Sequence, residues 1–268
     1  MNIKMIVTDL DRTLLRTDKT ISSYTAEILN LCRERGIKII FATARPMRTV
    51  KHFGVNVTTD ALILHNGAVI YAADERLCYY GIAPDIRDKI LSSISKDYPT
   101  ATISVEIDDV LYANFDIAEW GNTKAVRTTF DICIDLPDKY AEKIIIGVPS
   151  LENAGLLRAL TVEDMECFSK YITDDLYIEI SDGKFALIMH RNATKGAAVK
   201  AVADHIGIAM GGIAAFGDDY NDVSMLRECG VGVAVANALD EVKAAADYIC
   251  DVNNNDGVAK WIEERILI

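Results

Sequence analysis

Short apolar runs that stop at polar residues recur near both ends of this 268-residue chain. They alternate with segments of helical apolar spacing, such as Ile21, Tyr24, Ile28 and Leu31. Near-continuous apolar strands alternating with helices predict an α/β fold, in which helices cover both faces of a parallel sheet. The polar ends of the strands can meet only if both ends of the chain join one sheet. The predicted strands lie near residues 3–8, 37–42, 61–65, 185–189, 213–216, 232–235 and 248–250.

The first apolar run, Ile3 to Val7, ends in two acids, Asp9 and Asp11, which are one residue apart. It therefore ends where open α/β sheets bind their ligands, at the carboxyl ends of the strands. Side chains at i and i+2 can leave such a turn on the same side, so both acids could face one reacting centre. With no lysine nearby in the sequence to neutralise them, two close carboxylates would favour a bound divalent cation. The alternative is that both are turn or capping residues, a common role of aspartate.

Two later segments offer groups that could bind an anion. Thr43 follows a second apolar run, and Pro46 suits the first turn of a helix through Thr49. The Thr43 hydroxyl and the free N–H groups of that helix start would form an anion site, although threonine is also an ordinary helix cap. Lys195 opens another helix, where its charge opposes the helix dipole, which indicates a role other than helix stability. A solvated surface lysine is the alternative.

A further apolar run stops at Gly217 and is followed by the acids Asp218, Asp219 and Asp222. Asp218 and Asp222 flank a turn into the next helix, where one carboxylate can bind a metal and the other can orient its surroundings. Three acids also cap a helix start well, which is the alternative interpretation.

Four segments of the chain, taken in order, resemble the motifs of the haloacid dehalogenase superfamily. They are Asp9-Leu10-Asp11-Arg12-Thr13-Leu14-Leu15, Thr43-Ala44-Arg45-Pro46, Lys195-Gly196 and Gly217-Asp218-Asp219-Tyr220-Asn221-Asp222. Asn66-Gly67-Ala68, together with the segment from Asn221 to Leu226, is similar to the Cof-like (class IIB) phosphatase branch. Ala44 departs from the glycine that is usual in this branch, so we expect a slightly more crowded phosphate loop.

The resemblance implies a Rossmann-like parallel sheet core formed by residues 1–82 and 187–268. It also implies an inserted α+β cap of type C2B over residues 83–186, which in the family is mobile and closes over the active site. The middle of the chain has its own pattern, because alternation on either side of Asp108-Asp109 indicates a hairpin of Thr102 to Asp108 and Val110 to Phe115. Further strands are expected at residues 143–148 and 176–180, with a helix at 150–160 between them.

The resemblance also assigns roles to the residues of the motifs. It makes Asp9 the nucleophile that forms an aspartyl-phosphate, and Asp11 the acid and base that protonates the leaving alcohol and later deprotonates water. Mg²⁺ would be held by the Asp9 carboxylate, the Asp11 backbone carbonyl and the Asp218 carboxylate, and Asp222 would orient Lys195 or a metal-bound water. The phosphoryl oxygens would be held by Thr43, Lys195, Asn221 and the N–H groups of Leu10 and Ala44.

The expected substrate is a small phosphorylated metabolite such as a sugar phosphate, which the sequence does not specify further. Specificity should lie in Arg45, Asn66 and Gly67, which border the site, and in the cap. Candidate contacts in the cap are Lys124, Arg127, Trp120 and Tyr112, although an exposed surface would explain them equally well.

Residue identity weighs against several branches of the superfamily and leaves others open. The acid at position 11 argues against both the transport-ATPase branch, which has threonine there, and the dehalogenase branch, which lacks this second acid. A phosphomutase uses the same aspartyl-phosphate but returns the phosphoryl group to a sugar. A phosphate-binding regulatory module without turnover is the non-enzymatic alternative.

Composition bears on the partners of the protein and on the compartment in which we expect it. The net charge of −12 argues against nucleic acid as a partner and requires that any anionic substrate be bound by local positive groups. The six cysteines lie singly, without a CxxC pair, which is typical of small core residues in a reducing compartment. No membrane span and no secretory signal is evident, so we expect a cytoplasmic location. The sequence does not indicate the oligomeric state.

Overall fold

The computed structural model describes residues 1–51, 57–73, 75–115, 126–127, 136–150, 156–181 and 183–268. Internal contacts divide the chain into two compact units. The first unit comprises Met1–Tyr79 and Asn192–Ile268, and the second comprises Tyr80–Arg191. None of the described helices is long and apolar enough to cross a membrane.

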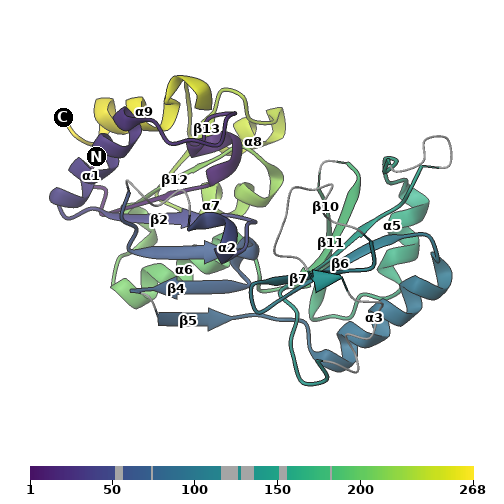
Figure 1. Cartoon of the computed structure of the whole chain (residues 1–268). Helices are drawn as coiled ribbons and strands as arrows, with labels where there is room; N and C mark the ends of the chain where they lie inside the picture. Colours follow the sequence, from purple (N-terminus) through teal and green to yellow (C-terminus); the bar gives the residue numbers. More distant parts are fainter. Residues whose placement is uncertain (52–56, 74, 116–125, 128–135, 151–155, 182) are drawn as a thin grey trace. The chain divides into compact units, whose positions relative to one another are not determined.

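The first unit is built on an eight-stranded sheet of order β14-β13-β12-β1-β2-β3-β4-β5 (Figure 1). β1 lies between β12 and β2 and runs parallel to both, so that Thr8 pairs with Phe216 on one side and with Phe41 on the other. This register brings the residues that follow these three strands to one edge of the sheet. The strands are β1 (Met5–Thr8), β2 (Lys38–Ala42), β3 (Ala61–Leu64), β4 (Val69–Ala72), β5 (Glu75–Tyr79), β12 (Ile213–Gly217), β13 (Val231–Val235) and β14 (Tyr248–Cys250).

The predicted α/β fold is confirmed, but the sheet is not parallel throughout. β14 to β3 are parallel, whereas β4 and β5 add to the sheet in antiparallel fashion. The chain reverses between β3 and β4 in the short turn His65–Gly67, where His65, Asn66 and Gly67 all have positive φ. A tight turn of this kind can join only antiparallel neighbours, because a parallel connection needs a longer crossover.

Helices of the first unit bury apolar residues against the sheet. α1 and α9 pack against each other, and α6 packs against α7 as well as against β3 and β4 (Figure 1). The buried face of α1 is formed by Thr25, Ala26, Ile28, Leu29 and Cys32, and Ser22 caps its start by accepting the N–H of Thr25. The helices are α1 (Ser23–Glu34), α2 (Met47–Val50), α6 (Lys195–Ile206), α7 (Val223–Glu228), α8 (Asp240–Ala245) and α9 (Gly257–Arg265).

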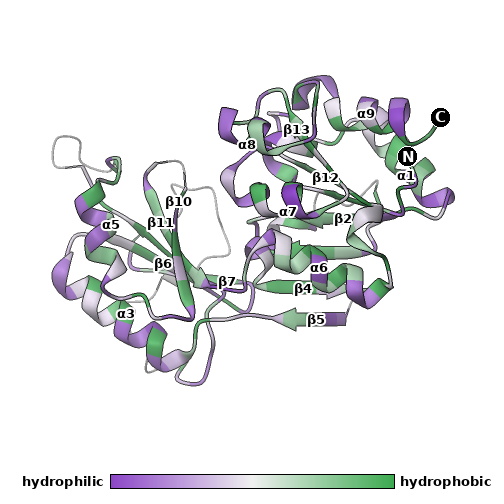
Figure 2. Cartoon of the chain, turned by 180° about the vertical axis from the view of Figure 1, so that it is seen from behind, coloured by the Kyte–Doolittle hydropathy of each residue, from purple (hydrophilic) through white to green (hydrophobic). Residues whose placement is uncertain are grey.

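The second unit has a six-stranded sheet of order β10-β11-β9-β6-β7-β8, antiparallel except between β7 and β8. The predicted hairpin is confirmed, since β6 and β7 pair around Asp108 and Asp109, whose φ values of 50° and 64° suit a tight two-residue turn. Apolar residues of the sheet pack with α3 and α5, both of which alternate hydrophobic and hydrophilic positions (Figure 2). The elements are α3 (Pro84–Asp97), β6 (Thr102–Ile107), β7 (Val110–Ala113), β8 (Val126–Arg127), β9 (Lys143–Gly147), α5 (Val162–Ser169), β10 (Leu176–Ser181) and β11 (Phe185–His190).

Two predictions about individual elements were wrong. The strand expected at residues 185–189 does not belong to the first sheet, because β11 pairs with β9 and β10 of the second unit. The helix expected at 150–160 is absent from the described part of that segment, where Leu157 forms a bridge with Pro149 and Ser150 N donates to Leu156 O. The helix of this region begins later, because Thr161 and Asp164 form a reciprocal capping box that fixes its start.

Candidate active site

Lys195 lies at the centre of a buried charge cluster in the first unit. It is the first residue of α6, a helix capped by the Thr194 hydroxyl, and its side chain is only 1% exposed. Its Nζ donates to Asp9 Oδ1 at 2.7 Å and to Asp222 Oδ1 at 2.5 Å. The alternative of a solvated surface lysine is therefore excluded. Although burial alone would lower the pKa of Lys195, the charges of Asp222 and Asp9 raise it above its ordinary value.

Asp222 has both carboxylate oxygens engaged by the protein. Oδ1 accepts from Lys195, and Oδ2 accepts the backbone N–H groups of Asp218 at 2.9 Å and Asp219 at 3.1 Å. Gly217 permits this approach, because a Cβ there would lie 2.4 Å from the Asp222 Cβ. Asp222 thus orients Lys195 and the backbone of the Asp218 loop.

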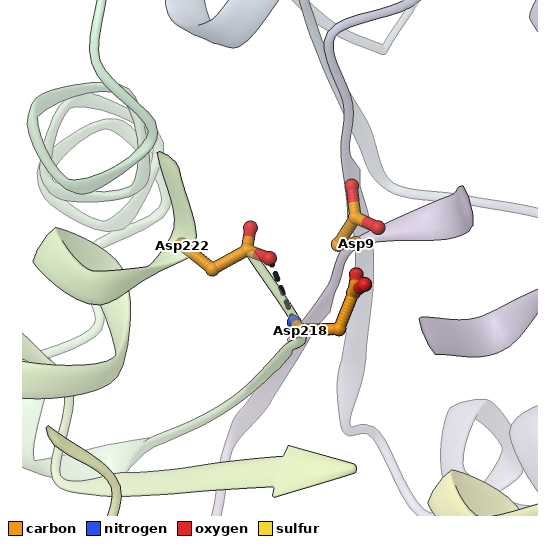
Figure 3. A group of neighbouring side chains, drawn as sticks. All are labelled: Asp9, Asp218 and Asp222. Carbon is orange, nitrogen blue, oxygen red and sulfur yellow. Dashed lines mark hydrogen bonds between the residues drawn. The ribbon is translucent and has the colours of Figure 1, made fainter. Parts of the chain in front are cut away.

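Asp218 follows β12 and faces the loop after β1. Its Oδ1 accepts from the Thr13 hydroxyl at 2.9 Å, and its Oδ2 lies 3.5 Å from Arg12 Nε. Figure 3 shows the Asp218 side chain extending toward Asp9, whereas the Asp222 carboxylate is directed at the Asp218 backbone nitrogen. The carboxylates of Asp9 and Asp218 therefore converge from two adjacent strands.

The donor set fits a hard divalent cation. Asp9, Asp218 and Asp222 are all buried, and each offers a carboxylate oxygen within 4.8 Å of the others. Burial, together with the neighbouring acids, raises the pKa of Asp9 to about 8 and that of Asp218 to about 6. Lys195 is the buried cation beside these acids, and Arg12 reaches Asp218 from the solvent side. A divalent cation would favour the ionised form of the acids, and carboxylate oxygens are the ligands that suit Mg²⁺.

Asp11 does not join this cluster. Its carboxylate accepts two hydrogen bonds from Arg45, with Nε–Oδ2 2.5 Å and Nη2–Oδ1 2.6 Å, and a third from Lys19 Nζ at 2.7 Å. Although burial alone would raise the pKa of Asp11, these partners lower it below its ordinary value. Although the sequence places no lysine directly beside these acids, the turn between η1 (Leu10–Leu14) and α1 brings Lys19 back to Asp11.

The segment from Thr43 to Arg45 is anchored at the ends of β2 and β3. Thr43 is buried, donates its N–H to Ile63 O at 2.8 Å, and accepts the Arg45 N–H on its hydroxyl at 3.2 Å. Pro46 is the N-cap residue of α2 and so lies just before the first turn, in which it was predicted to lie. Ala44 is not among the described non-glycine residues with positive φ, so its side chain introduces no backbone strain.

Asn66 and Asn221 meet from opposite parts of the first unit. Asn221 Nδ2 donates to Asn66 Oδ1 at 3.1 Å, and the Asn66 N–H donates to Thr43 O at 3.0 Å. Asn221 Oδ1 is buried and accepts no hydrogen bond from the described residues. Leu10, whose N–H was assigned to the phosphate, is fully buried in the loop after Asp9.

Sequence reasoning missed several residues of the site and named others that the structure does not describe. Thr13 and Arg12 contact Asp218 from within the first motif, Lys19 pairs with Asp11, and the Ser224 hydroxyl accepts the Gly196 N–H at 3.1 Å. Arg12, Thr13 and Ser224 lie inside segments that carry the resemblance, which was the available signal, whereas nothing in the sequence marked Lys19.

The candidate contacts in the second unit receive less support. Tyr112 is half-buried against the hydrophobic core of that unit, so the alternative of an exposed surface does not describe it. Arg127 is described only as part of β8, and Lys124 and Trp120 lie outside the described residues.

Known proteins share this architecture. The profile of the haloacid dehalogenase-like hydrolases matches residues 6–262. A 5-amino-6-(5-phospho-D-ribitylamino)uracil phosphatase of Bacillus subtilis is 27% identical, with 97% of this chain and 96% of the relative covered. A pyridoxal phosphate phosphatase of Escherichia coli is also 27% identical, with both chains fully covered. The solved structure of a subclass IIB sugar phosphatase superposes with a TM-score of 0.82 at 22% identity, covering 99% of this chain and 100% of that chain.

The superfamily predicted from the four motifs, and the Cof-like branch predicted from Asn66-Gly67-Ala68 and the segment from Asn221 to Leu226, are confirmed by the profile match. The profile spans nearly the whole chain, so its match does not rest on one motif. The chain belongs to the haloacid dehalogenase-like hydrolases.

Proposed function

We propose that this chain is a Mg²⁺-dependent cytoplasmic phosphatase that hydrolyses small phosphorylated metabolites through an aspartyl-phosphate on Asp9. The observation that carries the proposal is the buried cluster of Asp9, Asp218 and Asp222 around Lys195. Attack on a phosphate ester is opposed by its negative oxygens, so positioning and charge neutralisation dominate this chemistry. The cluster supplies a carboxylate and a fixed cation side by side.

Asp9 is placed to act as the nucleophile. Lys195 binds its Oδ1, while Oδ2 receives no hydrogen bond from the described residues. In the proposed reaction an Asp9 oxygen attacks phosphorus, the bond to the substrate alcohol breaks, and water later hydrolyses the acyl phosphate. Lys195, the Thr43 hydroxyl, Asn221 and the N–H groups of Leu10 and Ala44 would hold the phosphoryl oxygens.

Asp11 would transfer the protons. Its hydrogen bonds from Arg45 and Lys19 lower its pKa and so favour the ionised form, which can take a proton from the attacking water. To protonate the leaving alcohol in the first step, Asp11 must carry a proton. This requires that the hydrogen bonds from Arg45 and Lys19 to its carboxylate weaken or break when substrate binds. An Arg45 released in this way could contact the substrate, as proposed for its role in specificity.

The Asp9 and Asp218 carboxylates and the Asp11 backbone carbonyl would hold the Mg²⁺ ion. Bound there, Mg²⁺ supplies positive charge that offsets the repulsion between the carboxylate nucleophile and the phosphoryl oxygens. Asp222 would keep Lys195 and the Asp218 loop in place, because both of its oxygens are engaged with them.

Turnover of a phosphate monoester panel tests the proposal directly. Pyridoxal phosphate and several sugar phosphates would be incubated with the purified protein in Mg²⁺, in EDTA and in EDTA followed by excess Mg²⁺. We expect release of inorganic phosphate that EDTA abolishes and Mg²⁺ restores. Transfer of the phosphoryl group to another position of a sugar, with no free phosphate, would indicate a phosphomutase. Binding without either product would indicate a regulatory module.

Asp9→Asn isolates the nucleophile. We expect a normally folded protein with turnover reduced by more than about a thousandfold, because an amide neither attacks phosphorus nor binds the metal as a carboxylate does. Circular dichroism and phosphate release would be measured together. Activity within about tenfold of the wild type, far less than the loss of a covalent nucleophile costs, would remove Asp9 from this role.

A further inference from the structure

Arg12 occupies an unusual backbone position beside the acidic cluster. Its φ of 62° and ψ of 3° lie in the left-handed region, which arginine rarely adopts outside functional or strongly held sites. The position is held from both sides by Asn237, because Asn237 Nδ2 donates to Arg12 O at 2.7 Å and Arg12 Nη2 donates to Asn237 O at 3.3 Å. Asn237 is in turn fixed by Asn253, whose N–H donates to its Oδ1 at 2.9 Å.

This backbone conformation directs the guanidinium to one oxygen of Asp218. Oδ1 of Asp218 is taken by the Thr13 hydroxyl, so Oδ2 is the oxygen left for a cation. Arg12 Nε lies 3.5 Å from that oxygen. The Asp218 side chain is 4% exposed, whereas that of Arg12 is 57% exposed, so the guanidinium reaches the acid from the solvent side.

We infer that Arg12 is a built-in competitor of the divalent cation at Asp218. A cation that binds Oδ2 meets a guanidinium already placed at the same oxygen, and the two positive charges repel each other. Arg12 therefore weakens the resting affinity of the site for metal and must swing toward solvent when the metal binds. Its high exposure allows that movement, while the Asn237 clamp keeps the backbone in place.

The matched control lies four residues along the chain. Arg16 carries the same charge, but among the described residues its guanidinium pairs with Asp256, with Nη2–Oδ2 2.6 Å, and not with the cluster acids. Loss of charge at Arg16 changes the net charge of the protein equally without freeing Asp218. The inference rests on the proposed metal site, so the experiment measures binding of Mg²⁺ alone, with no substrate present.

Isothermal titration calorimetry with MgCl₂ would compare the metal-free wild type with Arg12→Gln, Arg12→Gly and Arg16→Gln. We expect the Mg²⁺ dissociation constant to fall about three- to tenfold in both Arg12 variants. The effect should be moderate, because solvent weakens but does not abolish the repulsion between the Arg12 guanidinium and a cation at Asp218. Glycine adopts the left-handed conformation without strain, so Arg12→Gly covers the case in which glutamine disturbs the loop. Arg16→Gln should remain within about twofold of the wild type, because its charge is distant and screened.

The same titrations distinguish a failure of the proposed metal site from a failure of the role inferred for Arg12. If the wild type and Asp218→Asn bind Mg²⁺ equally, or the wild type does not bind it, the proposed metal site is wrong and the inference falls with it. If the wild type binds through Asp218 but the Arg12 variants bind no more tightly, the metal site stands and the competitor role is overturned.

Discussion

The acids of the site differ in what each of their oxygens contacts. Both oxygens of Asp222 are engaged by the protein, whereas Asp9 and Asp218 each keep one oxygen without a hydrogen bond from the described residues. Asp218 Oδ2 has only Arg12 Nε beside it, at 3.5 Å, so this oxygen and Asp9 Oδ2 are the carboxylate oxygens left to bind a cation. The residue types alone could not distinguish these roles, because all three are aspartates at strand ends.

Asp11→Asn should separate proton transfer from nucleophilic attack. An asparagine cannot donate a proton as a carboxylic acid does, so we expect turnover of an alkyl phosphate to fall about 10²- to 10⁴-fold. An aryl phosphate with an acidic phenol as leaving group needs less protonation and should lose less in the first step. The ratio of the two rates in variant and wild type is the measurement. Equal losses on both substrates would count against the acid role.

At the scale of elements, two close approaches hold the Lys195 helix in place. A Cβ at Gly67 would lie 2.6 Å from the Thr194 carbonyl oxygen, and one at Gly196 would lie 2.9 Å from Ser224 Oγ. The turn His65–Gly67 and the start of α7 therefore pack directly against the first turn of α6. The Cof-like Asn66-Gly67 pair thus has a physical reason that does not require contact with substrate.

Gly67→Ala should displace Lys195. The added methyl group collides with Thr194 and the position has φ of 110°, so we expect a loss of about 1–3 kcal/mol in the free energy of unfolding and a lower kcat. Gly36→Ala is the matched control, because Gly36 also has positive φ, at 80°, but a Cβ there would meet nothing within 4 Å. Urea unfolding and phosphate release would be measured for both. An effect no larger at position 67 than at position 36 would show that the close approach is unimportant.

The capping box of α5 gives a pH-dependent contribution to stability in the second unit. Asp164 accepts hydrogen bonds from Arg158 and from the N–H and hydroxyl of Thr161, and these hold its pKa well below the ordinary value despite burial. Because the folded pKa is depressed, the stabilisation is complete above the unfolded pKa, about 4 for an aspartate, and is lost as pH falls toward the folded value.

Asp164→Asn should therefore destabilise the protein at pH 7 by about 1–3 kcal/mol, the usual cost of losing a cap and charged hydrogen bonds. The difference from the wild type should shrink when urea unfolding is repeated below about pH 4. Asp204→Asn is the control, since Asp204 pairs with Lys200 in solvent, at 66% and 59% side-chain exposure, and should change stability by less than about 0.5 kcal/mol. A constant difference across this pH range would show that the charge of Asp164 is not the cause.

Elements with strong local patterns could be predicted from the sequence, and those fixed by distant partners could not. The hairpin at Asp108-Asp109 and the central strands follow from alternation and apolar runs. The buried face of α1 was only partly predicted, because Leu31 is 38% exposed while Thr25 and Cys32 are buried. The strand at 185–189 has the same composition as a core strand, and only its pairing with β9 and β10 assigns it to the second unit.

In the candidate site, too, residues within local motifs could be predicted from the sequence, whereas contacts between distant segments could not. The four motifs identified the acids and Lys195, whose burial the structure adds. The pairing of Arg45 and Lys19 with Asp11 joins residues from three segments, so no local pattern reports it. Side-chain pairing between distant segments depends on the tertiary arrangement, which a single sequence does not display.

For the whole molecule, the net charge of −12 opposes the binding of an anionic substrate. An anion that approaches meets a repulsive global field, which local groups must overcome. Within the first unit, Lys195, Arg45, Lys19 and Arg12 are all gathered at the strand ends that carry Asp9 and Asp11. The positive groups are therefore concentrated where the proposed phosphate site lies.

We propose that the second unit serves as a cap that selects the substrate while the first unit carries the chemistry. All proposed catalytic and metal-binding residues belong to the first unit. The chain enters the second unit after Tyr79 and returns from it at Asn192, three residues before Lys195. A cap so connected could exclude water during phosphoryl transfer and contact the leaving group.

An alanine scan of exposed polar side chains in Tyr80–Arg191, and separately the variant Arg127→Ala, should change the ratio of kcat/KM among phosphate esters. We expect a change of about tenfold or more at some positions, because contacts to the leaving group differ between substrates. The inhibition constant of vanadate, which resembles the phosphoryl group alone, should stay within about twofold, because its proposed ligands lie in the first unit. Glu27→Ala and Lys260→Ala, on α1 and α9, are controls that should alter neither quantity. If the scan leaves every ratio unchanged, specificity must reside in Arg45 and its neighbours in the first unit. If instead vanadate binding and substrate ratios change together, the second unit contributes to the phosphate site itself, and the division of labour proposed for the two units is wrong.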